Sequence, residues 1–231
     1  MLGARGRQVL LMASIALPWA VRRFLYTRFL GWRLAPSARI GFSYVDAAEL
    51  SMAEDAWIGH LNVVRNLPLL QVGEGSIIGQ WNWLTVAVEL GSLASRAGEF
   101  RGLKLGNYSA IASRHYLDCA GGITIGDGSV LAGVRSTLLT HQADVLTATE
   151  VTAPIVIGDR CIVSANVSIT PGAVVPPRCV VAMGAVVTGR LEEESALYAG
   201  VPARVVRRDI GSGRFFSRKR GAVGIGPAES G

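Results

Sequence analysis

The sequence predicts an all-β fold in which the chain winds as a coil of short parallel strands. The main observation is a row of aliphatic residues spaced six positions apart: Ile157, Val163, Ile169, Val175, Val181 and Val187. An α-helix repeats every 3.6 residues and an isolated strand every two, so neither places one large apolar residue at every sixth position. Three six-residue faces make a turn of 18 residues, in which residues 18 apart stack on parallel strands of neighbouring turns.

A second row of residues supports the coil. Small or medium-sized residues follow the first row by four positions, at Cys161, Val167, Ala173, Cys179 and Ala185. The same phase, with shifts, can be followed back to Ile40. We therefore expect the coil to occupy residues 37–190, with two segments that leave it at 91–103 and 140–153. Segments that leave a rigid scaffold are frequent sites of function.

Residues 1–36 predict a basic amphipathic helix. The first 33 residues hold six arginines and no acid, and their apolar run is too short to span a bilayer. Arg22, Arg23 and Arg28 alternate with aromatic and aliphatic residues, which is typical of a helix lying on an anionic membrane surface. This predicts a cytoplasmic protein at the inner face of the membrane. Two alternatives stay open: a signal peptide, or a helix that covers the strand edge at the open end of the coil.

Residues 191–231 are expected to form a C-terminal extension with a basic tail. From residue 204 on, the chain holds seven Lys and Arg against two acids. No nucleic-acid-binding motif accompanies this charge, so nucleic acid is not an expected partner. The three cysteines are an odd number without metal-ligand spacing, which indicates a reducing compartment and no metal site. Cys161 and Cys179 are expected to stack as buried thiols, with a disulfide as the alternative.

Three sequence runs resemble one family. "IVIGDRCIVSANVSITPG", "CVVAMGAVVTG" and "YAGVPARVVRR" are similar to the hexapeptide-repeat acyltransferases, over residues 105–208. Within that family, "SRHYLD" and "TH" resemble the O-acetyltransferases of exopolysaccharide and capsule clusters, beside the galactoside and maltose acetyltransferases. The resemblance implies a left-handed parallel β-helix and a homotrimer, with an active site in each cleft between neighbouring coils.

Histidine is the natural base for acyl transfer to a hydroxyl, which is a poor nucleophile without one. The chain has three: His60, His115 and His141. His141 begins the 140–153 segment and matches the family's catalytic His. Asp144, three residues on, is expected to orient the His141 ring, although an Asp that only ends a turn is the alternative. His60 is expected to be structural.

His115 has the same spacing to an acid, Asp118, and is a second catalytic candidate. In a trimer, His115 of one chain and His141 of the next are expected to face the same acceptor. Arg114, Tyr116 and Asp118 are then expected to contact the acceptor. In galactoside and maltose acetyltransferases the comparable wall carries Asn, so the role of His115 does not transfer from the resemblance.

Acetyl-CoA is the donor that the resemblance implies. Its phosphates require fixed cations at one end of the site, and its pantetheine arm a narrow apolar channel. The family positions that meet the nucleotide are Arg204 and Arg207, and those along the pantetheine arm are Ala165, Met183, Gly184 and Thr188. Gly189 stands where the family commonly has Lys, which removes one phosphate contact. The oxyanion donor is expected to be a backbone N–H near Ser164 or Ala165.

The expected function is direct transfer of an acetyl group to a sugar hydroxyl in a polysaccharide or a lipid-linked glycan, with His as general base. One alternative keeps the catalyst but takes another acyl-CoA or an acyl carrier protein as donor, or an amine as acceptor. A non-enzymatic trimeric scaffold is another. A zinc hydratase is disfavoured because the three histidines, 55 and 26 positions apart, include no close pair.

Overall fold

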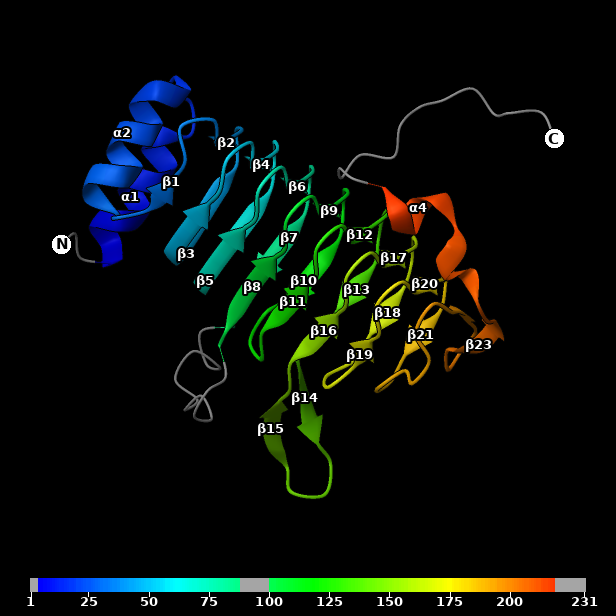
Figure 1. The fold of residues 1–231 in the computed structure, drawn as a ribbon. Coiled ribbons are helices and arrows are strands. Elements are labelled where there is room, and N and C mark those ends of the chain that lie inside the picture. Colours follow the sequence, from blue (N-terminus) through cyan, green and yellow to red (C-terminus); the bar gives the residue numbers. More distant parts are fainter. Residues whose placement is uncertain (1–3, 88–99, 219–231) are drawn as a thin grey trace.

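The computed structural model describes residues 4–87 and 100–218, most of which form a coil of short parallel strands (Figure 1). One sheet supplies two faces of the coil. Its strands are β1 (Arg33–Leu34), β3 (Tyr44–Met52), β5 (Val63–Val72), β7 (Trp83–Thr85), β8 (Gly102–Leu105), β10 (Tyr116–Asp118), β11 (Ile123–Ile125), β13 (Thr137–Leu138), β16 (Ile155–Ile157), β18 (Ser168–Ile169), β19 (Val174–Val175) and β21 (Val186–Val187).

A second sheet supplies the third face. It contains β2 (Arg39–Ile40), β4 (Trp57–Ile58), β6 (Ile77–Ile78), β9 (Ala110–Ile111), β12 (Val130–Leu131), β17 (Ile162–Val163), β20 (Val180–Val181), β22 (Leu197–Ala199) and β23 (Arg204–Arg207). Pairing is parallel except between β22 and β23. The first sheet spans two faces because the long β5 turns a corner, pairing with β7 through one end and with β8 through the other.

The residues of the six-position row form the core, which confirms the predicted parallel coil. All six are at most 2% exposed. Residues 18 apart are register partners, as in the pairs Val163 with Val181 and Ile169 with Val187. Stacking side chains of one type buries each against two neighbours, and such burial of an aliphatic side chain stabilises the fold by about 1.5 to 3 kcal/mol. The period in the sequence therefore sets both the core and the register.

Polar side chains also stack, in two ladders within corners of the coil. The first contains Ser43, Asn62, Asn82, His115 and Ser136, and each accepts the backbone N–H of the next member. The second contains Ser76, Ser109, Ser129, Cys161 and Cys179. Both thiols are buried and unbridged, as predicted. Burial raises the pKa of the Cys161 thiol to about 12, so this cysteine is a structural member of its ladder.

Two helices, rather than one, cover the first end of the coil: α1 (Ala4–Ser14) and α2 (Trp19–Phe29). They are separate because Pro18 lacks a backbone N–H and stands at the N-cap of α2. Leu11 and Tyr26 are buried in the core cluster, and Arg7 forms an ion pair of 2.9 Å with Asp46 of β3. The helices therefore cover the strand edge, which was one of the open alternatives. Within the described residues, no helix has the length and apolar character needed to cross a membrane.

At the other end, the coil continues past residue 190. Strand β22 stacks on β20, and β23 turns back along β22. A short 3-10 helix, η1 (Ile210–Ser212), and α4 (Arg214–Ser217) follow. Phe216 is buried and its carbonyl accepts a hydrogen bond from Arg160. Between the two ends, an antiparallel hairpin of β14 (His141–Asp144) and β15 (Thr149–Thr152) leaves the coil, within the expected segment 140–153. Most of the other expected segment, 91–103, lies outside the described residues.

Candidate active site

His141 is the residue at which the chain leaves the coil. Strand β13 ends at Leu138, and the hairpin begins with His141 on β14. The buried side chain of Leu138 holds β13 in the core, whereas the His141 side chain remains 32% exposed. The hairpin thus places one edge of the imidazole at the surface, beside the face formed by β10, β13, β18 and β21.

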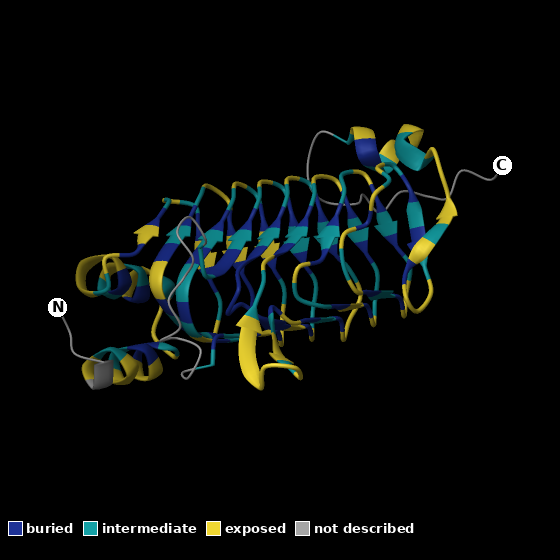
Figure 2. Cartoon of the chain, turned by 90° about the horizontal axis from the view of Figure 1, so that it is seen from below, coloured by how far each residue is buried: buried dark blue, intermediate teal, exposed yellow. Residues whose placement is uncertain are grey.

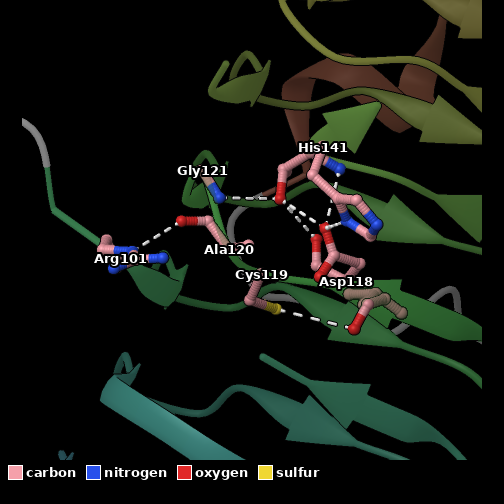
Figure 3. A network of polar contacts seen from close by, with 8 residues as sticks. Arg101, Asp118, Cys119, Ala120, Gly121 and His141 are labelled. Atoms are coloured by element: carbon pink, nitrogen blue, oxygen red, sulfur yellow. Dashed lines mark hydrogen bonds and ion pairs between the residues drawn. The ribbon is translucent and has the colours of Figure 1, made fainter. Parts of the chain in front are cut away.

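Asp118 holds the other edge of the ring. It ends β10, the strand next to β13, and its side chain is 2% exposed. The Nδ1 of His141 lies 2.8 Å from Asp118 Oδ2, and Figure 3 shows the ring facing this carboxylate. A carboxylate only accepts, so Nδ1 carries the proton and donates it. This tautomer leaves the Nε2 lone pair free to accept a proton, as a general base requires.

Thr140 and Gly121 fix the carboxylate in turn. The N–H of Thr140 donates to Asp118 Oδ2 at 3.1 Å, and its Oγ1 lies 2.8 Å from both Oδ2 and the Asp118 carbonyl oxygen. The N–H of Gly121 donates to Thr140 Oγ1 at 2.8 Å. A Cβ at position 121 would stand 2.8 Å from the Thr140 and Ala153 carbonyl oxygens, so glycine permits this approach. Thr140 is fully buried, which keeps water from the bonds that hold Asp118.

The prediction that Asp144 orients His141 is wrong, and so is the prediction that Asp118 contacts the acceptor. His141 and Asp144 stand three positions apart on one extended strand, where such residues face opposite sides. Asp144 Oδ1 accepts the N–H of Leu146 at 2.9 Å and so forms the hairpin turn, the alternative reading of this residue. The Leu146 N–H lowers the pKa of the Asp144 carboxyl. Asp118, buried behind the ring, performs the orienting role instead.

His115 lies inside the coil, which contradicts its prediction as a catalytic residue. Its side chain is buried, and its Nδ1 accepts the N–H of Ser136 at 3.1 Å. Burial lowers the pKa of His115 to about 4, against the opposing effect of the Gly133 carbonyl. The ring occupies the ladder position that Asn82 fills one turn earlier. A neutral, enclosed imidazole cannot take a proton from a substrate held outside the coil.

Arg114 and Tyr116 flank the buried His115 and are both exposed. Arg114 stands at the corner before β10 with a φ of 60°. Tyr116 begins β10 and is 40% exposed, two positions from Asp118 on the same strand. Burial and the neighbouring Asp118 raise the pKa of the Tyr116 phenol. Their expected contact with an acceptor is therefore compatible with their position next to His141.

The residues expected to bind the donor lie along the same side of the coil. Ala165 and Gly184 stack in one corner, where the Gly184 N–H donates to the Ala165 carbonyl at 3.1 Å. Met183 in that corner is 70% exposed, and Thr188 is exposed directly after β21. Because β21 pairs with β18 and β18 pairs with β13, these residues border the face that carries His141. The corner and this face together form one continuous surface.

Three further residues complete the picture of the donor region. Arg204 and Arg207 are exposed on β23, at the end of the coil beyond the stacked corner. The N–H of Ser164 donates to the Val181 carbonyl at 3.0 Å within the coil, so it is not available as an oxyanion donor. Within the described residues, no group of three His, Cys, Asp or Glu side chains is arranged to hold a metal ion.

Thr140 was not singled out from the sequence, and Asp118 was assigned a different role. The signal for both was the stacking of Leu117 on Leu138, which are 21 positions apart. That register places the residues after Leu117 beside those after Leu138, and hence Asp118 beside Thr140 and His141. Two extra residues in the turn concealed this pairing, since a strict 18-residue period predicts a different partner.

Comparison with known proteins gives structural matches of low sequence identity. No protein-family model matches the chain, and no curated protein matches it. A maltose O-acetyltransferase from Clostridium difficile 630 is 20% identical with a TM-score of 0.49, over 59% of this chain and 68% of that chain. A hexapeptide-repeat acetyltransferase from Vibrio cholerae, complexed with acetyl coenzyme A, is 18% identical with a TM-score of 0.47, over 86% and 82%. An N-acyltransferase from Bacillus cereus, complexed with dTDP and 3-hydroxybutyryl-CoA, is 17% identical with a TM-score of 0.46, over 78% and 81%. Because identities this low leave the chemistry open, the function is inferred from the residues of this chain.

Proposed function

We propose that this protein is an O-acetyltransferase that moves an acetyl group from acetyl-CoA to a hydroxyl of a sugar in a polysaccharide or lipid-linked glycan. The observation that carries the proposal is the pair of Asp118 and His141. A buried carboxylate bonded to Nδ1 leaves Nε2 of a partly exposed imidazole as a proton acceptor. A histidine with only a structural role has no need of a dedicated, buried partner on the neighbouring strand.

The reaction needs no covalent intermediate with the protein. His141 Nε2 takes the proton of the acceptor hydroxyl while the hydroxyl oxygen attacks the thioester carbonyl carbon. The tetrahedral intermediate collapses, the carbon–sulfur bond breaks, and the imidazolium returns the proton to the CoA thiolate. Asp118 stabilises the imidazolium between these two steps. Holding donor and acceptor side by side contributes up to about 7 to 11 kcal/mol.

The placement of both substrates follows from the same surface. The pantetheine arm runs along the corner of Ala165 and Gly184, and the CoA phosphates reach Arg204 and Arg207. The acceptor lies on the β10 side of His141, against Tyr116. In the homotrimer that the family resemblance implies, a neighbouring coil closes this surface into a cleft and excludes water from the thioester.

A mutant series tests the proposal. Purified His141→Ala is assayed for transfer from acetyl-CoA to a panel of sugars, together with Asp118→Asn and the control Asp144→Asn. Loss of a general base lowers kcat by about 100-fold to 10,000-fold. We expect that loss for His141→Ala, a smaller one for Asp118→Asn, and none for Asp144→Asn. Unchanged turnover in His141→Ala would remove this residue from the mechanism.

A further inference from the structure

The two helices that cover the first end of the coil bury polar groups and expose apolar ones. On the inner side, the hydroxyls of Ser14 and Tyr26 lie 2.9 Å apart. The guanidinium of Arg22, which is 2% exposed, donates to the Ile40 carbonyl at 3.1 Å and lies 5.6 Å from the centre of the Tyr26 ring. A helix at a water-facing surface has the opposite arrangement, with its polar side outward.

The outer side of both helices is apolar. Val9 is 67% exposed and Met12 64% exposed on α1, while Val21 is 45% and Phe24 62% exposed on α2. At 100° per residue, each pair stands on the side of its helix opposite the buried Leu11 or Tyr26. Figure 2 shows exposed residues on both helices at the end of the coil. These side chains form one outward surface, here called the cap surface.

Positive charge surrounds the cap surface. The first 45 residues contain no acid, and the first one in the chain, Asp46, is paired with Arg7. Arg28 and Arg39 are exposed. A hollow of about 340 Å³ beside α2 is lined by Arg23 and Arg39 together with the rings of Trp19 and Phe24. Two guanidinium groups beside aromatic rings provide the contacts that a lipid phosphate and the upper part of its acyl chain require.

We propose that the cap surface docks on an anionic lipid bilayer. Apolar side chains ringed by arginine, with no acid, are complementary to the boundary between acyl chains and negatively charged headgroups. Val9, Met12, Val21 and Phe24 enter that boundary, and the arginines remain at the level of the phosphates. The helices lie on the membrane without crossing it. Four strand spacings of about 4.8 Å separate β3 from β13, so His141 stands roughly 20 Å along the coil from the cap.

Vesicle sedimentation tests the docking. Full-length protein is mixed with vesicles of phosphatidylcholine alone, or of phosphatidylcholine with 30% phosphatidylglycerol, in 0.1 M and 0.5 M NaCl. We expect binding to the anionic vesicles, weakened at least fivefold by the higher salt. The double variant Val21→Ser/Phe24→Ser is expected to bind at least tenfold more weakly. Arg28→Gln/Arg39→Gln is expected to lose about fivefold for each charge removed at low salt.

A matched control uses the exposed tip of the hairpin. Val145 and Leu146 are 90% and 92% exposed, so Val145→Ser/Leu146→Ser removes as many exposed apolar side chains elsewhere, and it is expected to bind like the unmodified protein. Equal binding by Val21→Ser/Phe24→Ser, equal binding to neutral vesicles, or loss only in the hairpin variant would each overturn the proposal. So would self-association without vesicles that this cap variant abolishes, since a second copy would then occupy the surface. None of these results depends on acetyl transfer.

Discussion

Replacing His115 with Asn is expected to preserve the coil and to remove part of its sensitivity to acid. Asn62 and Asn82 occupy the two preceding ladder positions, each accepting a backbone N–H through Oδ1 and donating to a carbonyl through Nδ2. Asn at position 115 can therefore accept the Ser136 N–H as the imidazole does. Unlike the imidazole, it does not titrate.

The magnitude follows from the pKa of His115, about 4 in the folded protein against 6.5 for an unperturbed imidazole. Because burial lowers the folded value, the unfolded chain binds the proton more readily between these two pH values. Stability is intact above pH 6.5 and is lost as the pH falls toward 4, by about 1.4 kcal/mol per pH unit. At pH 5.0, protonation of His115 thus lowers the free energy of unfolding by about 2 kcal/mol.

Urea unfolding at pH 7.5 and pH 5.0 measures this contribution. The unmodified protein is expected to lose about 2 kcal/mol more between these pH values than His115→Asn does. His115→Ala provides the contrast, because it leaves the Ser136 N–H without an acceptor and costs about 1 to 3 kcal/mol at both pH values. Equal acid sensitivity in the unmodified protein and His115→Asn would refute the titration of His115. A tenfold loss of kcat in a stably folded His115→Asn would restore His115 to the mechanism.

Three further changes test the site and the core. Thr140→Val, which removes the hydroxyl held between Asp118 and the Gly121 N–H, is expected to lower stability by about 1 to 3 kcal/mol and kcat severalfold; Thr140→Ser should restore both in the same unfolding and turnover assays. Arg204→Gln with Arg207→Gln is expected to raise the KM for acetyl-CoA while leaving kcat nearly constant, and an unchanged KM would place the phosphates elsewhere. Ile169→Ala, in the middle of the core row, is expected to lower the free energy of unfolding by about 2 to 5 kcal/mol; a loss under 1 kcal/mol would contradict its burial.

The sequence by itself determined the coil and its core. A period of six with one aliphatic residue per period has a single economical solution, in which Val163 stacks on Val181 and Ile169 on Val187. It also identified His141, because acyl transfer needs a base and the chain has three histidines. Both inferences depend on local spacing or residue type, and these can be read along the chain.

Only the tertiary structure decided which carboxylate serves that histidine and what the other histidine does. Asp118 reaches His141 through the pairing of β10 with β13, a register that inserted residues shift away from the regular period. His115 and Asp118 are close neighbours in sequence, yet one side chain is closed into a ladder and the other touches the site. Stacking of turns decides such contacts, because it brings together residues whose separation in the chain changes with every insertion.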